Sequence, residues 1–281
     1  MFSLNRIELI GYQTQPVTIR QTPTGTSVTD LNLVVPYTFQ NGKGERLTGR
    51  SFHTVTLWGS MADIAGQYVK PGAQVFVSGR LQTDSWEDQE SAEKRSKTKV
   101  VALDMILLDP KDGQKNPPDQ AGLLLQCLNR AEVIGNATRD PEMRTTTGGQ
   151  NVLTLGIATN ERWRDKASQE IKERAEFHSV VIWGDLAKAV QNAVKKGQRV
   201  YVSGRVQTRS WETQAGQKRQ TTEIIADHFS LLGTKNADIS ASIQTDAGAV
   251  PSSASEAVPV AAGSIPEIKY ESEIKPEDLP F

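Results

Sequence analysis

Apolar and polar residues alternate along much of the chain, and this pattern predicts β-strands that bury one face. Leu153, Leu155 and Ile157 alternate with smaller residues, and an equivalent run lies in the first half of the chain. A period of two is typical of such half-buried strands. Helical spacing is convincing only over residues 185–196 and at the counterpart, residues 60–70; Gly197 ends the one helix and Pro71-Gly72 the other. The pattern therefore predicts a β-rich protein with few helices.

The chain contains two copies of one sequence pattern, offset by 124 or 125 residues. Residues 52–59 (FHTVTLWG) match residues 177–184 (FHSVVIWG), and residues 75–83 (VFVSGRLQT) match residues 200–208 (VYVSGRVQT). Two copies with so long a period indicate duplicated domains and exclude a solenoid of short repeats.

Domain boundaries follow from the repeat and from composition. We predict a first domain over residues 1–110, a polar linker over 111–123, a second domain over 124–235 and a disordered acidic tail over 236–281. The tail has too few large apolar residues to offset the entropy of ordering. About five strands, with one helix between the third and the fourth, fit a small Greek-key barrel in each domain. We therefore expect an all-β protein with two tandem OB-fold barrels.

Charge is distributed unevenly, although the net charge of the whole chain is −1. The tail carries a net charge of −6, and the remaining residues carry +5. A basic body with an acidic tail predicts a core that binds polyanions and a tail that binds partners. The first domain is neutral and the second carries +5, so the second is expected to dominate polyanion affinity.

The sequence shows no set of residues typical of a catalytic site. One cysteine, three histidines and no acidic cluster spaced for a metal leave no metal site, and no nucleophile–base arrangement or phosphate loop is found. We predict no enzymatic activity and no cofactor. An apolar run long enough to span a membrane and a secretory signal are both absent, so a cytoplasmic location is expected.

Aromatic and cationic residues share one face of the expected strands. Phe177 and Trp183 have the same parity, opposite to Ile182, and on a later strand Arg205 and Arg209 share a face. A lone aromatic on a strand is more often buried, but here parity separates the aromatics from the core positions. Bases stack on aromatic rings and phosphates attract cations, so this combination suits single-stranded nucleic acid. The candidate binding residues are Phe39, Phe52, Trp58, Arg80, Trp86, Arg144, Arg162, Trp163, Arg164, Phe177, Trp183, Arg205, Arg209 and Trp211.

Residues 129–232 resemble the bacterial single-stranded DNA-binding proteins along their whole length. The pieces that carry the resemblance are DPEMR at 140–144, LGIATN at 155–160, WRD at 163–165 and FHSVVIWG at 177–184. The order and spacing of these pieces make the match specific. The chain's last residues are similar to the acidic tip with which that family binds partner proteins; they are Glu277, Asp278, Leu279, Pro280 and Phe281.

The resemblance implies a protein that binds and protects single-stranded DNA without sequence preference during replication, recombination and repair of DNA damage. It also implies recruitment of replication and repair proteins through the tip, a homodimer that presents four OB domains, and a place near the bacterial nucleoid. In the family, DNA wraps across aromatic residues whose positions match Trp163, Phe177, Trp183 and Trp211. The first domain departs from the pattern, because Asp84 stands where the second domain has Arg209.

Two other classes are considered beside this one. An OB-fold protein of replication restart or RNA binding would not need the acidic tip. An enzyme with duplicated OB domains would need a catalytic cluster, which the sequence does not supply.

Overall fold

The computed structural model describes residues 2–40, 46–87, 94–109, 127–164, 169–212 and 218–233. The predicted linker and the predicted tail lie outside these residues, as do the side chains of Phe39 and Trp211. No helix in the described segments is long and apolar enough to cross a membrane.

Each copy of the repeat folds into a closed β-barrel with one short helix. The first barrel consists of β1 (Leu4–Gln13), β2 (Arg20–Gln21), β3 (Ser27–Gln40), β4 (Arg46–Trp58), α1 (Ser60–Tyr68), β5 (Gln74–Glu87) and β6 (Lys94–Leu107). β1 pairs with β3 and β5, and β4 pairs with β6 in parallel, which closes the barrel. The expectation of two tandem OB-fold barrels is confirmed.

The second barrel repeats the first element by element. It consists of β7 (Leu128–Ala137), β8 (Glu142–Thr145), β9 (Asn151–Arg164), β10 (Ile171–Trp183), α3 (Gly184–Ala193), β11 (Arg199–Glu212) and β12 (Lys218–Leu232). Alternation fixes the core, because Leu153, Leu155 and Ile157 on β9 are fully buried. The two-residue strand β2 and its counterpart β8 add an edge strand that the sequence pattern did not predict.

Both helices are shorter at the C-terminal end than the sequence predicted. Helix α1 ends at Tyr68 and α3 at Ala193, and the following residues, Val69 and Val194, have extended backbone. Both valines are buried in the cores. Because a β-branched residue favours extended backbone, the chain leaves the helix at the valine and inserts its side chain into the barrel.

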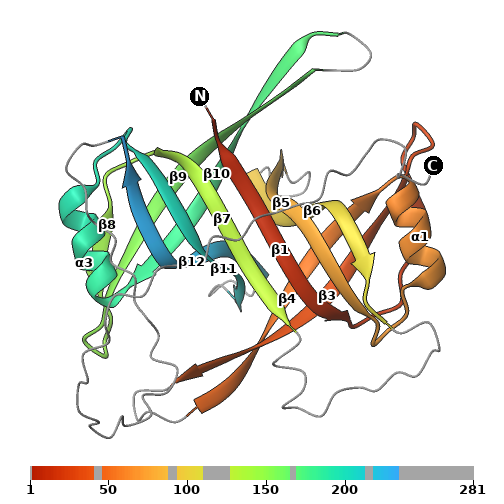
Figure 1. Cartoon of the computed structure of the whole chain (residues 1–281), viewed down its shortest axis with the longest axis horizontal. Coiled ribbons are helices and arrows are strands. Elements are labelled where there is room, and N and C mark those ends of the chain that lie inside the picture. The colour runs from red at the N-terminus through yellow and green to blue at the C-terminus, as the bar shows by residue number, and fades with distance from the viewer. Residues whose placement is uncertain are drawn as a thin grey trace, which may run out of the picture. The chain divides into compact units, whose positions relative to one another are not determined.

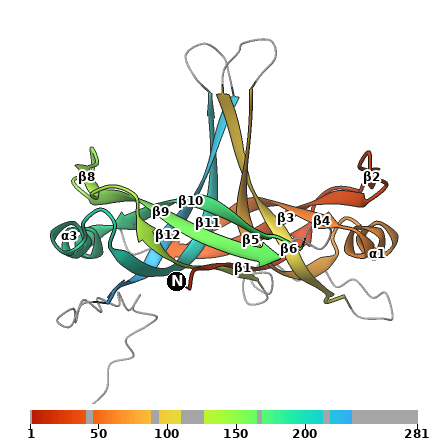
Figure 2. The ribbon, with the colours of Figure 1, turned by 90° about the horizontal axis from the view of Figure 1, so that it is seen from above.

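The two barrels join through an antiparallel ladder between β1 and β7 (Figure 1). The register runs from Leu4 opposite Ile134 to Ile10 opposite Leu128. In the described residues, twelve strands thereby form one continuous hydrogen-bonded sheet. The hairpins β5–β6 and β11–β12 extend from the joint side by side (Figure 2), and Thr222 Oγ1 donates to the carbonyl of Thr98 at 3.5 Å.

Glycine is required where β5 and β11 bend across their partner strands. The pairing register shifts at Gly79 on β5 and at Gly204 on β11, because the partner strands β6 and β12 each carry one extra residue there, Leu103 and Asp227. A Cβ atom at either glycine would collide with the backbone carbonyl of the facing strand, that of Val101 or Ile225. The close approach lets one strand serve both the barrel and its long hairpin.

Candidate nucleic-acid interface

A groove of about 450 Å³ crosses the outer face of the first barrel. Strand pairing builds it: Trp58 at the end of β4 faces Val28 on β3, which in turn faces Arg20 on β2. Trp58 and Trp86 are 44% and 47% exposed, so their rings are open to a ligand. The full lining is Arg20, Gln21, Val28, Asp30, Thr54, Thr56, Trp58, Asp84, Trp86, Lys97 and Lys99.

Two carboxylates pair with two of the cations that line this groove. Asp30 Oδ2 lies 2.6 Å from Arg20 Nη2, and Asp84 Oδ2 lies 2.7 Å from Lys99 Nζ. Gln82 Nε2 also donates to Asp84 Oδ1 at 3.0 Å. Partial burial raises the pKa of Asp84, but the hydrogen bonds from Lys99 and Gln82 and the charges of Lys99 and Arg174 outweigh burial, so this pKa lies below its ordinary value. Asp84 therefore stays ionised and offsets one positive charge of the groove.

The second barrel presents aromatic rings at the predicted positions on β10. Phe177 is 66% exposed and Trp183 is 39% exposed, whereas Ile182 between them is fully buried. Trp183 faces Val152 on β9, and Val152 faces Arg144 on β8. The register therefore brings the predicted residues Trp183 and Arg144 onto one outer face.

Most predicted cations of the second barrel already have an acidic neighbour. Arg162 lies 3.1 Å from Glu173, and Arg144 lies 3.5 Å from Glu142. Arg209 forms an ion pair with Glu223, and Arg205 lies 3.7 Å from Asp227. Arg205 also stacks over the ring of Tyr37 in the first barrel, at 5.5 Å from the ring centroid. The net charge of the domain already counts these acidic partners, but it does not show that each of these four arginines must leave an acidic neighbour to meet a phosphate.

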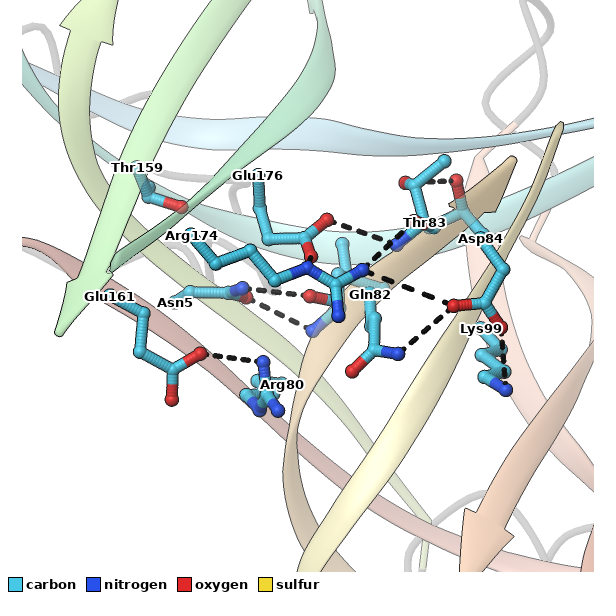
Figure 3. Close-up of polar contacts among 12 residues, drawn as sticks. Asn5, Arg80, Gln82, Thr83, Asp84, Lys99, Thr159, Glu161, Arg174 and Glu176 are labelled. Atoms are coloured by element: carbon cyan, nitrogen blue, oxygen red, sulfur yellow. Dashed lines mark hydrogen bonds and ion pairs between the residues drawn. The ribbon is translucent and has the colours of Figure 1, made fainter. Parts of the chain in front are cut away.

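Arg80 lies at the contact between the barrels, where the sequence predicted a DNA-binding residue. Its Nη1 atom is 2.6 Å from Glu161 Oε2 in the second barrel, and its side chain is largely covered (Figure 3). Arg205, which the repeat aligns with Arg80, meets Tyr37 at the corresponding place. A role of Arg80 in DNA binding remains a prediction.

The remaining predicted residues fall into two groups. Phe52 on β4 is exposed, and Trp163 and Arg164 lie exposed at the end of β9, where Trp163 faces Lys172 across the hairpin. The side chains of Phe39 and Trp211 lie outside the described residues, although their backbones belong to β3 and β11. The predicted partner-binding tip, residues 277–281, also lies outside the described residues.

Arg20, Lys97 and Lys99 line the groove but were not among the residues predicted from the sequence. Lys97 and Lys99 alternate with Thr98 and Val100 along β6, so the parity argument used for β10 would have found them. Arg20 lies on a strand of two residues, which is too short to show any period.

Two histidines, His53 and His178, are buried, one in each barrel. His53 Nε2 lies 2.9 Å from Ser51 Oγ and 3.3 Å from Asn129 Nδ2 of the other barrel. Asn129 exchanges two hydrogen bonds with the backbone of Val206, which fixes its amide so that the NH₂ group faces His53. Among the residues described, no group of histidine, cysteine and acidic side chains is placed to hold a metal ion.

Comparison with known proteins agrees with this architecture. The single-strand binding protein family matches residues 4–108 and 128–232. A single-stranded DNA-binding protein of Thermus thermophilus is 36% identical over 227 residues, covering 79% of this chain and 81% of that protein. One from Rickettsia conorii is 43% identical over 116 residues, 40% of this chain and 76% of that protein.

A solved structure extends the likeness to three dimensions. The wild-type single-stranded DNA binding protein from Thermus aquaticus superposes with a TM-score of 0.65 and 28% identity, covering 84% of this chain and 97% of that one. Both barrels are thus matched in sequence and in fold. With both of its repeats matched, this chain belongs to the single-strand binding protein family.

Proposed function

We propose that this chain binds single-stranded DNA without sequence preference, through base stacking and phosphate contacts, and protects it without enzymatic activity. The observation that carries the proposal is the groove of the first barrel, where Trp58 and Trp86 lie beside Arg20, Lys97 and Lys99. Every base has a flat π face, so stacking on such rings tolerates any sequence. The relatives in Thermus and Rickettsia, which are named single-stranded DNA-binding proteins, support the same function.

A fluorescence titration with a thymine homopolymer tests this function. Stacking of bases on the exposed tryptophans should quench their emission strongly, and raised salt should weaken binding because counterions are released from the DNA. Titration without quenching at low salt would contradict the proposal. The cellular setting proposed for this activity is DNA replication, recombination and repair in the bacterial cytoplasm.

The chain is further proposed to form a homodimer with four OB domains. An apolar row, partly exposed, crosses the outer face of four adjacent strands, from Ile106 through Phe76 and Ile10 to Leu128. Ile106 is 50% exposed, so one end of the row is open to a partner. A two-fold contact between two such faces would bury the row on both chains.

Light scattering of the full chain at micromolar concentration measures this assembly. We expect the mass of a dimer, and Ile106→Glu should shift the mass toward the monomer because it places a charge in the buried row. A wild-type protein with the mass of one chain would exclude the dimer.

The acidic tip is proposed to bind replication and repair proteins. Glu277 and Asp278 repel phosphate, Phe281 offers an apolar ring, and Pro280 restricts the backbone and so lowers the entropy lost on docking. A matching partner would offer an apolar pocket with basic groups at its rim.

Deletion of residues 279–281 should abolish capture of these partners from a bacterial lysate, while DNA affinity stays equal or rises slightly at low salt. The full chain is the matched control. Unchanged capture, or a collapse of DNA affinity, would show that the tip has another role.

A further inference from the structure

Contacts between the barrels differ on the two sides of the joint. The repeat places Arg174 and Glu176 in the second copy where Gly49 and Ser51 stand in the first. Long charged side chains therefore reach from the second barrel to the first on one side, and nothing comparable can reach back from the aligned positions.

Glu176 anchors this contact from a buried position. Its side chain is 4% exposed, and its Oε1 atom lies 2.6 Å from Arg174 Nε. Oε2 accepts a hydrogen bond from the Thr83 N–H at 3.0 Å, and Arg174 Nη2 donates to the Thr83 carbonyl at 3.1 Å. Two side chains of β10 thus bind both the N–H and the carbonyl of Thr83 on β5 (Figure 3).

The same contact brings Arg174 to the groove of the first barrel. Arg174 Nη2 lies 3.9 Å from Asp84 Oδ1, while Lys99 Nζ lies 2.7 Å from the other oxygen, Oδ2. Asp84 and Lys99 both line the groove that holds the two tryptophans. One carboxylate is therefore shared between a lysine of its own barrel and an arginine of the other.

We propose that Arg174, a residue of the second barrel, is a positioning residue of the DNA groove in the first barrel. Lys99 can turn to a phosphate only if its ion pair with Asp84 breaks. With Arg174 in place, Asp84 keeps a cationic neighbour when Lys99 turns to the phosphate, so no partly buried carboxylate is left alone. The inference rests on the proposed single-stranded DNA binding, and it makes binding by the first barrel depend on the second.

A double-mutant cycle in the full chain tests this coupling. Wild type, Arg174→Gln, Asp84→Asn and the double variant are titrated with a thymine homopolymer at several salt concentrations. Arg174→Gln should weaken binding about fourfold at 0.15 M salt and flatten the salt slope by about 0.7, as expected for one lost phosphate contact on a single strand. Asp84→Asn should bind at least as well as wild type.

The decisive result is the effect of Arg174→Gln in the Asp84→Asn background. With the carboxylate gone, Lys99 needs no release, and Arg174→Gln should change neither affinity nor slope. A fourfold loss that persists in this background would overturn the proposal, because Arg174 would then act on DNA directly or through the fold. An Arg174→Gln variant that binds like wild type would overturn it as well.

A second variant guards against loss of folding. Arg174→Gln leaves the buried Glu176 without its arginine, which by itself can destabilise the joint. Arg174→Gln with Glu176→Gln removes both charges, and it should show the same flattened slope with a thermal unfolding midpoint close to that of wild type. A wild-type slope in this folded variant would contradict the proposal.

One further variant separates this inference from the proposed function. Trp58→Ala with Trp86→Ala should lose affinity in the same titration. If this variant binds like wild type, the groove is not a DNA site and the proposed function fails there. If it loses affinity while the cycle shows no coupling, only the role of Arg174 is excluded.

Discussion

Alanine at both Phe177 and Trp183 should weaken binding to a thymine homopolymer by about 2–6 kcal/mol, because each lost stacking platform removes roughly 1–3 kcal/mol. This corresponds to a loss of affinity of roughly thirtyfold or more. The two rings project outward from β10, and Ile182 between them fills the core. Fluorescence of the remaining tryptophans, or anisotropy of a labelled oligonucleotide, measures the loss.

The first barrel offers a matched control for this pair. Phe52 and Trp58 occupy the aligned positions on β4 and are similarly exposed. Alanine at both should cost less affinity if the second barrel dominates, as its net charge predicts. Equal losses would contradict the expectation that the second barrel dominates. Because all four rings are exposed, unfolding midpoints should stay within a few degrees of wild type.

Acidification from pH 7 to pH 5 should destabilise the protein by about 2 kcal/mol for each of two histidines. Burial lowers the pKa of His53 and of His178 from 6.5 to about 4. The unfolded chain takes up protons near pH 6.5, whereas the folded chain resists them down to about pH 4. The stabilisation is therefore complete above pH 6.5 and is lost as the pH falls from 6.5 toward 4.

Urea unfolding at a series of pH values measures this loss. His53→Gln with His178→Gln should flatten the dependence on pH, even if the variant starts from lower stability. Asp227 acts in the opposite direction, because burial raises its pKa and the charge of Arg205 only partly compensates, so protonation of Asp227 favours the folded state. A wild-type stability that does not change between pH 7 and 5 would show that water reaches both imidazoles.

The barrel cores could be predicted from the sequence because they follow a local rule. Residues on a strand alternate between two faces, so the alternation around Leu155 and the parity of Phe177 were enough to separate core from surface. Because the pattern occurs twice, the same argument applied to both copies. The same reasoning placed both helices, and it misplaced only their ends, where a buried valine decides the backbone.

Contacts between the copies could not be predicted in the same way. Arg80 looks like any outward cation on a strand, and only the placement of the second barrel shows that Glu161 lies 2.6 Å away. Within the second barrel, the pairing of Arg209 with Glu223 also escaped a count of charges, since a sum over residues contains no distances. The placement of one barrel against the other depends on contacts between residues far apart in the sequence, and a local sequence pattern does not predict such contacts.

The ladder between β1 and β7 joins two barrels of the same polypeptide. Two separate identical chains would have to make such a barrel–barrel contact symmetrically. In a two-fold pair of identical chains, any substitution appears twice, once on each side of the axis. Here a substitution appears once, so glycine and serine can stand on one side while Arg174 and Glu176 stand on the other. Covalent linkage also keeps the halves together at any protein concentration. Fusion of the two copies thus frees each half to specialise without giving up its neighbour.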